Sequence, residues 1–208
     1  MAFVNYSDIK NSLSSQNFIG SGKEGNVYFI DDQIIKIFHE NRKSGLDRIS
    51  DEGLIQLCNL KLETFNVPNN LVVDDKICGT IEDVIMEEEL DESKIDFAKI
   101  KDDLITLSEN GFTINDLFYN YMGVDDGIRF YDLTSYKYIK TDNEFMKNKI
   151  LKDNIQTMNI FLAGLINFGA FKKGATNERV KIYQAYEFQK EHCGDLFYGD
   201  IFGSNIKK

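Results

Sequence analysis

Three glycines near the start of the chain have a spacing that suits phosphate binding. They lie in the run Gly20-Ser21-Gly22-Lys23-Glu24-Gly25, which Asn26 and Val27 follow. Glycines allow positive φ and let backbone N–H groups approach phosphate oxygens. The same spacing occurs in dinucleotide-binding folds, where a helix follows the third glycine. Residues 26–30 are instead β-type, so the run favours a hairpin that covers phosphates, with an ordinary hairpin turn as the alternative.

A lysine lies in the next strand-like run. Lys36 stands between Ile35 and Ile37, and burying its ammonium is costly unless a carboxylate is close. Glu52, early in the following helical segment, is the expected partner, and Asp51 is its nearest competitor. The alternative is a lysine on the solvent face of the strand.

Further polar groups stand in loops downstream of these elements. Residues 111–120 contain Asn115, Asp116 and Asn120, and Asp132 follows a short hairpin pattern. In order and type, the glycine run, strand lysine, helix glutamate and these later residues resemble the protein-kinase superfamily. The resemblance covers about residues 18–166 and is nearest to minimal, atypical kinases of bacterial or phage type.

The resemblance implies binding of ATP and Mg²⁺. Asp116 would accept the proton of the acceptor hydroxyl, Lys36 would hold the phosphates, and Asn120 and Asp132 would bind the metal. Residues 84–87 resemble a strand that enters the hinge, with Met86 as gatekeeper. The residues implied for nucleotide binding are Gly20, Ser21, Gly22, Gly25, Val27, Ile34, Lys36, Glu52, Met86, Glu87, Glu89 and Met122.

The catalytic-loop pattern departs from the family. In the family, four residues separate the catalytic Asp from the metal-binding Asn, whereas three separate Asp116 from Asn120. If Asn120 is instead aligned with the family's Asn, the position of the catalytic base is occupied by Asn115. An amide does not accept a proton as a base does, so that alignment implies weak or absent transfer. Ile114 stands where the family has histidine, and Leu133 and Thr134 replace its Phe-Gly. Residues 132–153 leave little room for an activation segment.

Four functions follow from these patterns. The first is a minimal protein Ser/Thr kinase that transfers the γ-phosphate of ATP to a hydroxyl. The second is a pseudokinase that binds nucleotide or a partner without the reaction. The third is a small-molecule kinase of the aminoglycoside type, and the fourth is an unrelated α+β binding protein.

The elements that must position these residues follow from hydrophobic periodicity and turn residues. Strands are predicted at 26–30, 33–38, 71–73, 77–81, 84–86, 121–124 and 128–131. Helices are predicted at 49–60, at 97–107 with a stop at Asn110-Gly111, and from about 143 onward, including a stripe from Val180 to Phe188. This order predicts an α+β, two-lobed kinase-like fold, with a β-rich N-lobe (1–88) holding one main helix and a reduced, mostly helical C-lobe (89–208).

Composition narrows the class of protein. A formal charge of −10 argues against nucleic-acid and anionic-membrane surfaces. The 42% hydrophobic content is enough for a real core. Three cysteines and two histidines without metal-ligand spacing favour free thiols over a disulfide framework or a zinc site. The apolar run 160–171 is too short to cross a membrane. We expect a cytoplasmic protein, with later export left open.

Overall fold

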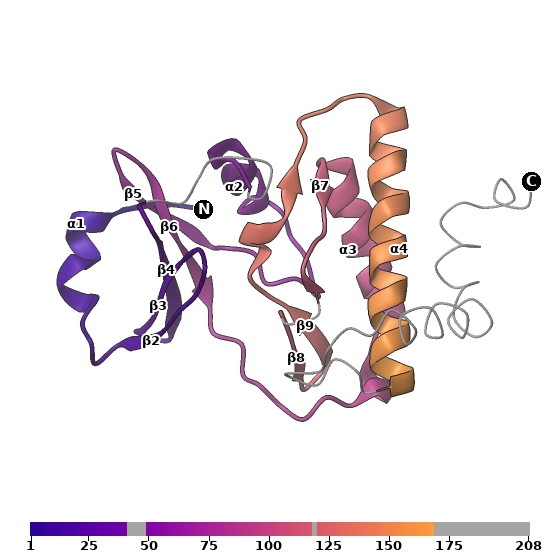
Figure 1. The fold of residues 1–208 in the computed structure, drawn as a ribbon, viewed down its shortest axis with the longest axis horizontal. Helices are drawn as coiled ribbons and strands as arrows, with labels where there is room; N and C mark the ends of the chain where they lie inside the picture. Colours follow the sequence, from indigo (N-terminus) through magenta and orange to yellow (C-terminus); the bar gives the residue numbers. More distant parts are fainter. Residues whose placement is uncertain (41–48, 118–119, 169–208) are drawn as a thin grey trace, which may run out of the picture.

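The computed structural model describes residues 1–40, 49–117 and 120–168 and has an α+β architecture (Figure 1). In this described part, four α-helices accompany a six-stranded mixed sheet and two small two-stranded sheets. The six-stranded sheet and α1 (Tyr6–Ile9) lie at one end of the molecule, and α3 (Phe97–Glu109) and α4 (Glu144–Phe168) lie at the other. The predicted α+β class is confirmed.

The large sheet has the strand order β1-β5-β6-β4-β3-β2. Only the β1–β5 pair is parallel; all other neighbours are antiparallel. Its strands are β1 (Phe3–Asn5), β2 (Phe18–Ser21), β3 (Gly25–Ile30), β4 (Gln33–Phe38), β5 (Asn70–Asp74) and β6 (Lys76–Asp83). Asp31 and Asp32 join β3 to β4 with φ of 49° and 60°. Two consecutive positive φ angles are typical of the tight hairpin turns that match strand twist.

Strand alternation gives the two faces of this sheet different roles. On one face Ile35, Val72 and Ile81 form a small core that packs against residues of β1 and α1. On the other face Lys36 lies opposite Thr80 and Ile34 lies opposite Glu82. This second face therefore carries the polar side chains of the candidate site.

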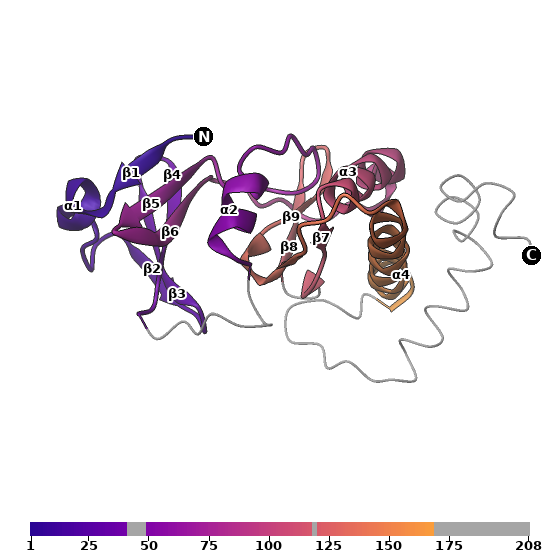
Figure 2. The same cartoon turned by 90° about the horizontal axis from the view of Figure 1, so that it is seen from above.

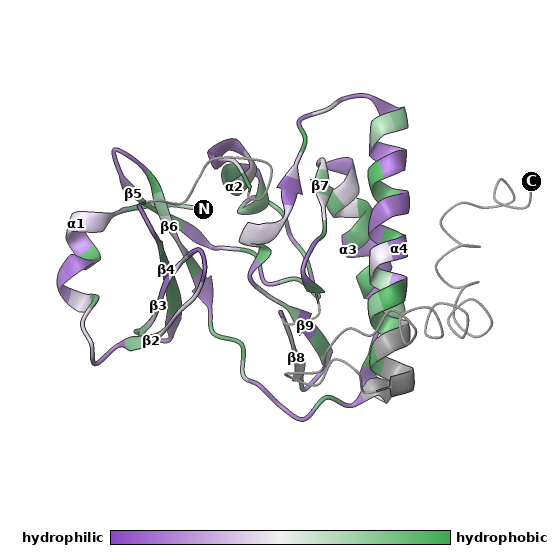
Figure 3. Ribbon diagram, viewed as in Figure 1, coloured by the Kyte–Doolittle hydropathy of each residue, from purple (hydrophilic) through white to green (hydrophobic). Residues whose placement is uncertain are grey.

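The main hydrophobic core joins α2 (Asp51–Leu57) to α3 and α4. Figure 2 shows α2 between the sheet and these two helices. Ser50 caps α2 by accepting a hydrogen bond from Gly53 N, and Asp96 caps α3 in the same way. Along α4 hydrophobic residues become denser towards the C-terminal half (Figure 3), where Ile155, Met158 and Phe161 are fully buried.

Two short sheets complete the fold near the core. The hairpin of β8 (Tyr121–Val124) and β9 (Gly127–Phe130) turns at Asp125-Asp126. Strands β7 (Phe112–Thr113) and β10 (Lys137–Tyr138) pair antiparallel. These elements bring the segment 131–136 to the face of the large sheet that carries Lys36, whose ammonium contacts Asp132 and Thr134.

Most predicted elements are confirmed, but the strand at 84–86 is wrong. β6 ends at Asp83, whose partner Gln33 is the first residue of β4. Beyond that point no strand among the described residues pairs with residues 84–86, so the β-branched residues 84 and 85 continue as an irregular segment. The predicted helix 49–60 is shorter, at Asp51–Leu57, and the stripe 180–188 lies outside the described residues.

No helix in the described ranges is long and apolar enough to cross a membrane. Cys58 and Cys78 are free thiols and partly buried.

Candidate functional site

Lys36 is the centre of a buried polar cluster. Its side chain is 10% exposed, and its ammonium donates to Asp132 Oδ1 at 2.5 Å, Thr134 Oγ1 at 2.8 Å and Glu24 Oε2 at 3.1 Å. An ammonium has three N–H donors, so these three oxygens use all of them. The cost of burying the charge is thereby offset by two carboxylates and a hydroxyl.

Thr134 joins the two carboxylates of this cluster. Its hydroxyl oxygen accepts from Lys36 and lies 2.6 Å from both Glu24 Oε2 and Asp132 Oδ1. Because the hydroxyl has one proton, it donates to one carboxylate at a time. The cluster therefore ties the glycine-rich turn, β4 and the segment after β9 together.

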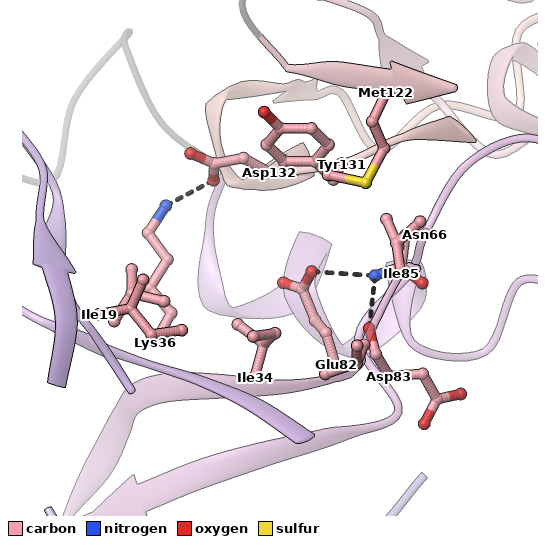
Figure 4. Close-up of a pocket in the computed structure, with 12 residues that line it drawn as sticks. Ile19, Ile34, Lys36, Asn66, Glu82, Asp83, Ile85, Met122, Tyr131 and Asp132 are labelled. Atoms are coloured by element: carbon pink, nitrogen blue, oxygen red, sulfur yellow. Dashed lines mark hydrogen bonds and ion pairs between the residues drawn. The ribbon is translucent and has the colours of Figure 1, made fainter. Parts of the chain in front are cut away.

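An apolar cavity of about 320 Å³ opens on one side of Lys36 (Figure 4). Figure 4 shows Ile34 on one side of the space and Met122 and Tyr131 on the other, with Glu82 pointing between them. The residues that line this cavity are Ile19, Val27, Ile34, Lys36, Asn66, Glu82, Asp83, Val84, Ile85, Met122, Tyr131 and Asp132. Its walls suit a flat, mostly apolar ring system with polar groups at its edge.

A polar cavity of about 550 Å³ adjoins the first. The two share Val27, Lys36 and Asp132. The lining residues are Gly22, Lys23, Glu24, Gly25, Val27, Lys36, Asn115, Asp116, Asn120, Asp132, Ser135 and Lys137. Lysine ammoniums, glycine backbone and oxygen ligands around one space suit an anionic group with a metal ion.

Gly25 fixes the base of the glycine-rich turn. A Cβ at this position would lie 2.3 Å from the carbonyl oxygen of Ile37, so only glycine fits without movement of the backbone. Gly22 N donates to Gly25 O at 2.9 Å, and a Cβ on Gly20 would meet no atom within 4 Å. The close approach of strands β3 and β4 thus depends on the third glycine alone.

Asn115 and Asp116 both line the polar cavity. Asp116 has φ of 54°, a conformation that Asp and Asn adopt more readily than most residues. Asn120 Nδ2 donates to Asp116 O at 2.9 Å, which closes the loop on itself. Asp116, Asn120 and Asp132 line one cavity, as their order in the sequence predicts, and Asn115 lines the same cavity.

A buried amide anchors the start of this loop. Asn154 of α4 is fully buried, its Oδ1 accepts from Ile114 N at 2.8 Å, and its Nδ2 donates to Phe112 O at 2.8 Å. The same Nδ2 donates to Ser108 Oγ at 2.8 Å. Sequence reasoning missed Asn154, because it lies 40 residues beyond the loop in an otherwise apolar helical stripe.

The expected pairing of Lys36 with Glu52 is wrong. Glu52 lies in the exposed first turn of α2 and accepts from Lys140 at 2.6 Å. Glu24 from the glycine-rich run takes the place beside Lys36. The reason is local: the turn between β2 and β3 folds Glu24 over the end of β4, whereas α2 directs its capping end towards Lys140.

The predicted hinge residues also need correction. Met86 is 76% exposed and Glu87 and Glu89 are exposed, so none of them lines either cavity. The cavity wall is formed three residues earlier, by Asp83, Val84 and Ile85. Gly20 and Ser21 likewise fall outside both linings.

Several residues of the site had no binding role predicted from the sequence. Glu82, Asn66 and Tyr131 line the apolar cavity, and Thr134 lies within the Lys36 cluster. The pairing of Glu82 with Ile34 places its side chain on the same face of the sheet as Lys36, but this register is known only from the structure. Asn66 comes from an irregular segment, and no pattern in the sequence marks it.

Oxygen ligands for a divalent cation are present in the polar cavity. Within the ranges that the structure describes, no three His, Cys, Asp or Glu side chains form a metal-binding group. Mg²⁺ is commonly held by one or two protein oxygens together with substrate phosphates and waters. The Asp132 carboxylate, whose side chain is 37% exposed, and the Asn120 amide fit that mode.

Burial raises the pKa of Glu82 to about 7, with a further contribution from repulsion by Asp132. Lys36 and hydrogen bonds from Thr80 and Asn66 act in the opposite direction. Since the pKa of the folded protein is the higher one, the protonated carboxyl is favoured by folding.

Glu82→Gln is therefore expected to change how stability depends on pH. The stabilisation from proton binding to Glu82 is complete below about pH 4.5 and is lost as the pH rises through about 7. The free energy of unfolding of the variant relative to wild type should increase by up to about 3 kcal/mol between pH 4.5 and 8. Urea unfolding at several pH values measures this difference; a constant difference would contradict it.

The two candidate partners of Lys36 can be separated by matched substitutions. Glu24→Gln is expected to lower the free energy of unfolding by about 1–3 kcal/mol, because a partly buried charge-assisted hydrogen bond is weakened. Glu52→Gln breaks only an exposed pair with Lys140 and should cost nothing measurable. Denaturant unfolding at neutral pH compares them, and equal losses would contradict the assignment of Glu24.

Comparison with protein-family models gave no match, and a search of curated proteins found no matching relative. The function therefore has to be argued from the geometry of the two cavities.

Proposed function

We propose that this protein binds ATP with Mg²⁺ in the two joined cavities and transfers the γ-phosphate to a hydroxyl group, as a minimal kinase. The observation that carries the proposal is the position of Lys36 at the junction of an apolar and a polar cavity, bonded to Asp132. A nucleotide has the same division, with a flat base at one end and an anionic chain at the other. The polar cavity is also bordered by Gly22 and Gly25.

A kinase-like, two-lobed arrangement is part of this proposal. The apolar cavity takes Ile34 and Glu82 from the large sheet and Met122 from the β8–β9 hairpin, with Tyr131 just beyond that hairpin. Residues 83–85 line it where the chain leaves the sheet. The proposed lobes are thus the large sheet with α1 and α2, and the helices α3 and α4 with the two small sheets.

The proposed reaction assigns one role to each polar group. The oxygen of the acceptor hydroxyl attacks the γ-phosphorus as its proton passes to the Asp116 carboxylate, and the bond to the bridging oxygen of ADP breaks. Lys36 and backbone N–H groups of the glycine-rich turn bind phosphate oxygens. Mg²⁺ held by Asp132 and Asn120 would neutralise phosphate charge. The proposed acceptor is a Ser or Thr side chain of a protein.

The direct test is incubation with γ-labelled ATP and Mg²⁺, with and without a generic acceptor protein such as casein. Label on the chain itself or on the acceptor, or release of labelled phosphate, would support transfer. Nucleotide-dependent stabilisation in the absence of all three would instead support the second candidate.

That second candidate is a nucleotide-binding protein without phosphotransfer. The observation in its favour is that all three donors of Lys36 are used by protein oxygens, including Glu24. A phosphate would have to displace one of them. Asn115 beside Asp116 is a second observation in its favour, since the amide would be inert as a base.

A further inference from the structure

One buried carboxyl has no role in the reaction proposed above. Glu82 is 7% exposed, yet it lines the apolar cavity rather than the polar one. Thr80 Oγ1 donates to it at 3.3 Å and Asn66 Nδ2 at 3.4 Å. Both distances are longer than the usual range for such bonds. A carboxyl group offers about four acceptor positions when ionised and retains acceptors when protonated, so capacity remains for a ligand.

The register of the sheet places Glu82 and Lys36 at different depths of the same face. Glu82 lies opposite Ile34, and Lys36 lies two residues further along β4, opposite Thr80. Two residues span about 6.6 Å along a strand. Lys36 borders both cavities, whereas Glu82 borders only the apolar one. A ligand whose phosphates lie at Lys36 would therefore bring the edge of its base to Glu82.

Asn66 holds this carboxyl in place. Its Nδ2 donates to Glu82 Oε2 and also to Asp83 O at 3.2 Å (Figure 4). The amide thus fixes Glu82 relative to the point where the chain leaves the sheet. An acceptor that is held in an apolar cavity favours ligands with a donor at the matching position and disfavours ligands with an acceptor there.

We propose that Glu82 makes the site selective for adenine among purines, by accepting a hydrogen bond from the 6-amino group. The proposal rests on the nucleotide binding proposed above. Guanine and hypoxanthine carry an oxygen at the same position, which would face the ionised carboxylate of Glu82 without a proton between them. Unsubstituted purine carries only a C–H there and would leave the carboxyl without its ligand bond.

The test compares the Mg²⁺ complexes of three nucleotides: ATP, inosine triphosphate and purine riboside triphosphate. Dissociation constants are measured by calorimetry at pH 8, where Glu82 is mostly ionised because its pKa is about 7. Wild type is expected to bind ATP about tenfold or more tightly than purine riboside triphosphate, and inosine triphosphate weakest.

Two substitutions at the same position give different expected patterns. Glu82→Met removes the acceptor, so ATP and purine riboside triphosphate should bind equally. Glu82→Gln supplies an amide that both accepts and donates, so the gap between ATP and inosine triphosphate should narrow. Glu109→Gln, an exposed carboxylate at the end of α3, is the control and should keep the wild-type ratios. Circular dichroism and thermal unfolding verify that each variant is folded.

The outcomes separate the two proposals. If wild type binds the nucleotides but Glu82→Met and Glu82→Gln keep its ratios, adenine selection by Glu82 is overturned while nucleotide binding stands. If wild type binds none of the three, nucleotide binding fails, and the selection that rests on it fails too. A change of ratios only in the two Glu82 variants supports the inference.

Discussion

Lys36→Met is expected to weaken nucleotide binding by about ten- to a hundredfold. The substitution removes an ammonium that borders both cavities, and a charge-assisted hydrogen bond contributes about 1.5–3 kcal/mol. At a nucleotide concentration one hundred times the dissociation constant, wild type should be stabilised by about 2.7 kcal/mol. Unfolding with and without Mg-ATP at that concentration should show about 1.3–2.3 kcal/mol of this stabilisation lost in the variant.

The variant also changes the unliganded protein. Without Lys36, the carboxylates of Glu24 and Asp132 lose the ammonium between them and keep the hydroxyl of Thr134, so the free energy of unfolding should fall by about 1–3 kcal/mol. Lys36→Arg keeps the positive charge but replaces the compact ammonium with a planar guanidinium, so it tests whether the shape of the cation matters. Lys140→Met, which removes the exposed partner of Glu52, is the matched control. Equal stabilisation of Lys36→Met and wild type by Mg-ATP would contradict the proposed site.

Asp116→Asn is expected to lower the rate of phosphate transfer by about 10²- to 10⁴-fold, the usual contribution of a general base. Asparagine retains the shape of the side chain and tolerates the φ of 54° at this position. Nucleotide binding should therefore be unchanged. Single-turnover transfer from γ-labelled ATP measures the rate, and calorimetry measures the binding.

Asn115→Ala is the matched comparison, since its side chain lines the same cavity. We expect less than a tenfold loss from it. A large loss from Asn115→Ala together with none from Asp116→Asn would favour the other alignment of the loop. Activity that neither substitution changes would assign proton acceptance to a different group.

The sequence predicts most of the fold because its signals are local. Asp31-Asp32 between two β-type runs predicts a hairpin whose turn needs two positive φ angles, and the structure has both. The apolar stripe that begins at Phe97 and the stop at Asn110-Gly111 bound α3 within one residue. The end of β6 was missed, because it depends on where β4 begins and not on residues 84–86 themselves.

The site residues that belong to the kinase-like motifs were predicted from the order of those motifs along the chain. Val27, Lys36, Asp116, Asn120 and Asp132 all line one of the cavities. The partner of Lys36 was missed, because ion pairs depend on side-chain direction in the fold. Glu24 and Glu52 are both carboxylates at plausible distances along the chain, and only the turn between β2 and β3 decides between them.

Glu82 shows a second limit of sequence reasoning. In the sequence, Glu82 stands at the end of an apolar run and shortly before the three glutamates at 87–89. This pattern is typical of a solvent-exposed acidic segment. The burial of Glu82 follows from pairing with Ile34 across the sheet. The acidic residues that follow are exposed, so the same residue type has opposite surroundings within seven positions.

The amide of Asn154 bears on how the loop at 114–120 tolerates changes in length. Asn154 fixes the start of the loop at Ile114, and Tyr131 N fixes its end by donating to Asn120 O at 3.0 Å. These two anchors lie on different elements, α4 and the segment after β9. Because the two ends of the loop are held separately, a deletion between them would leave both anchoring hydrogen bonds in place.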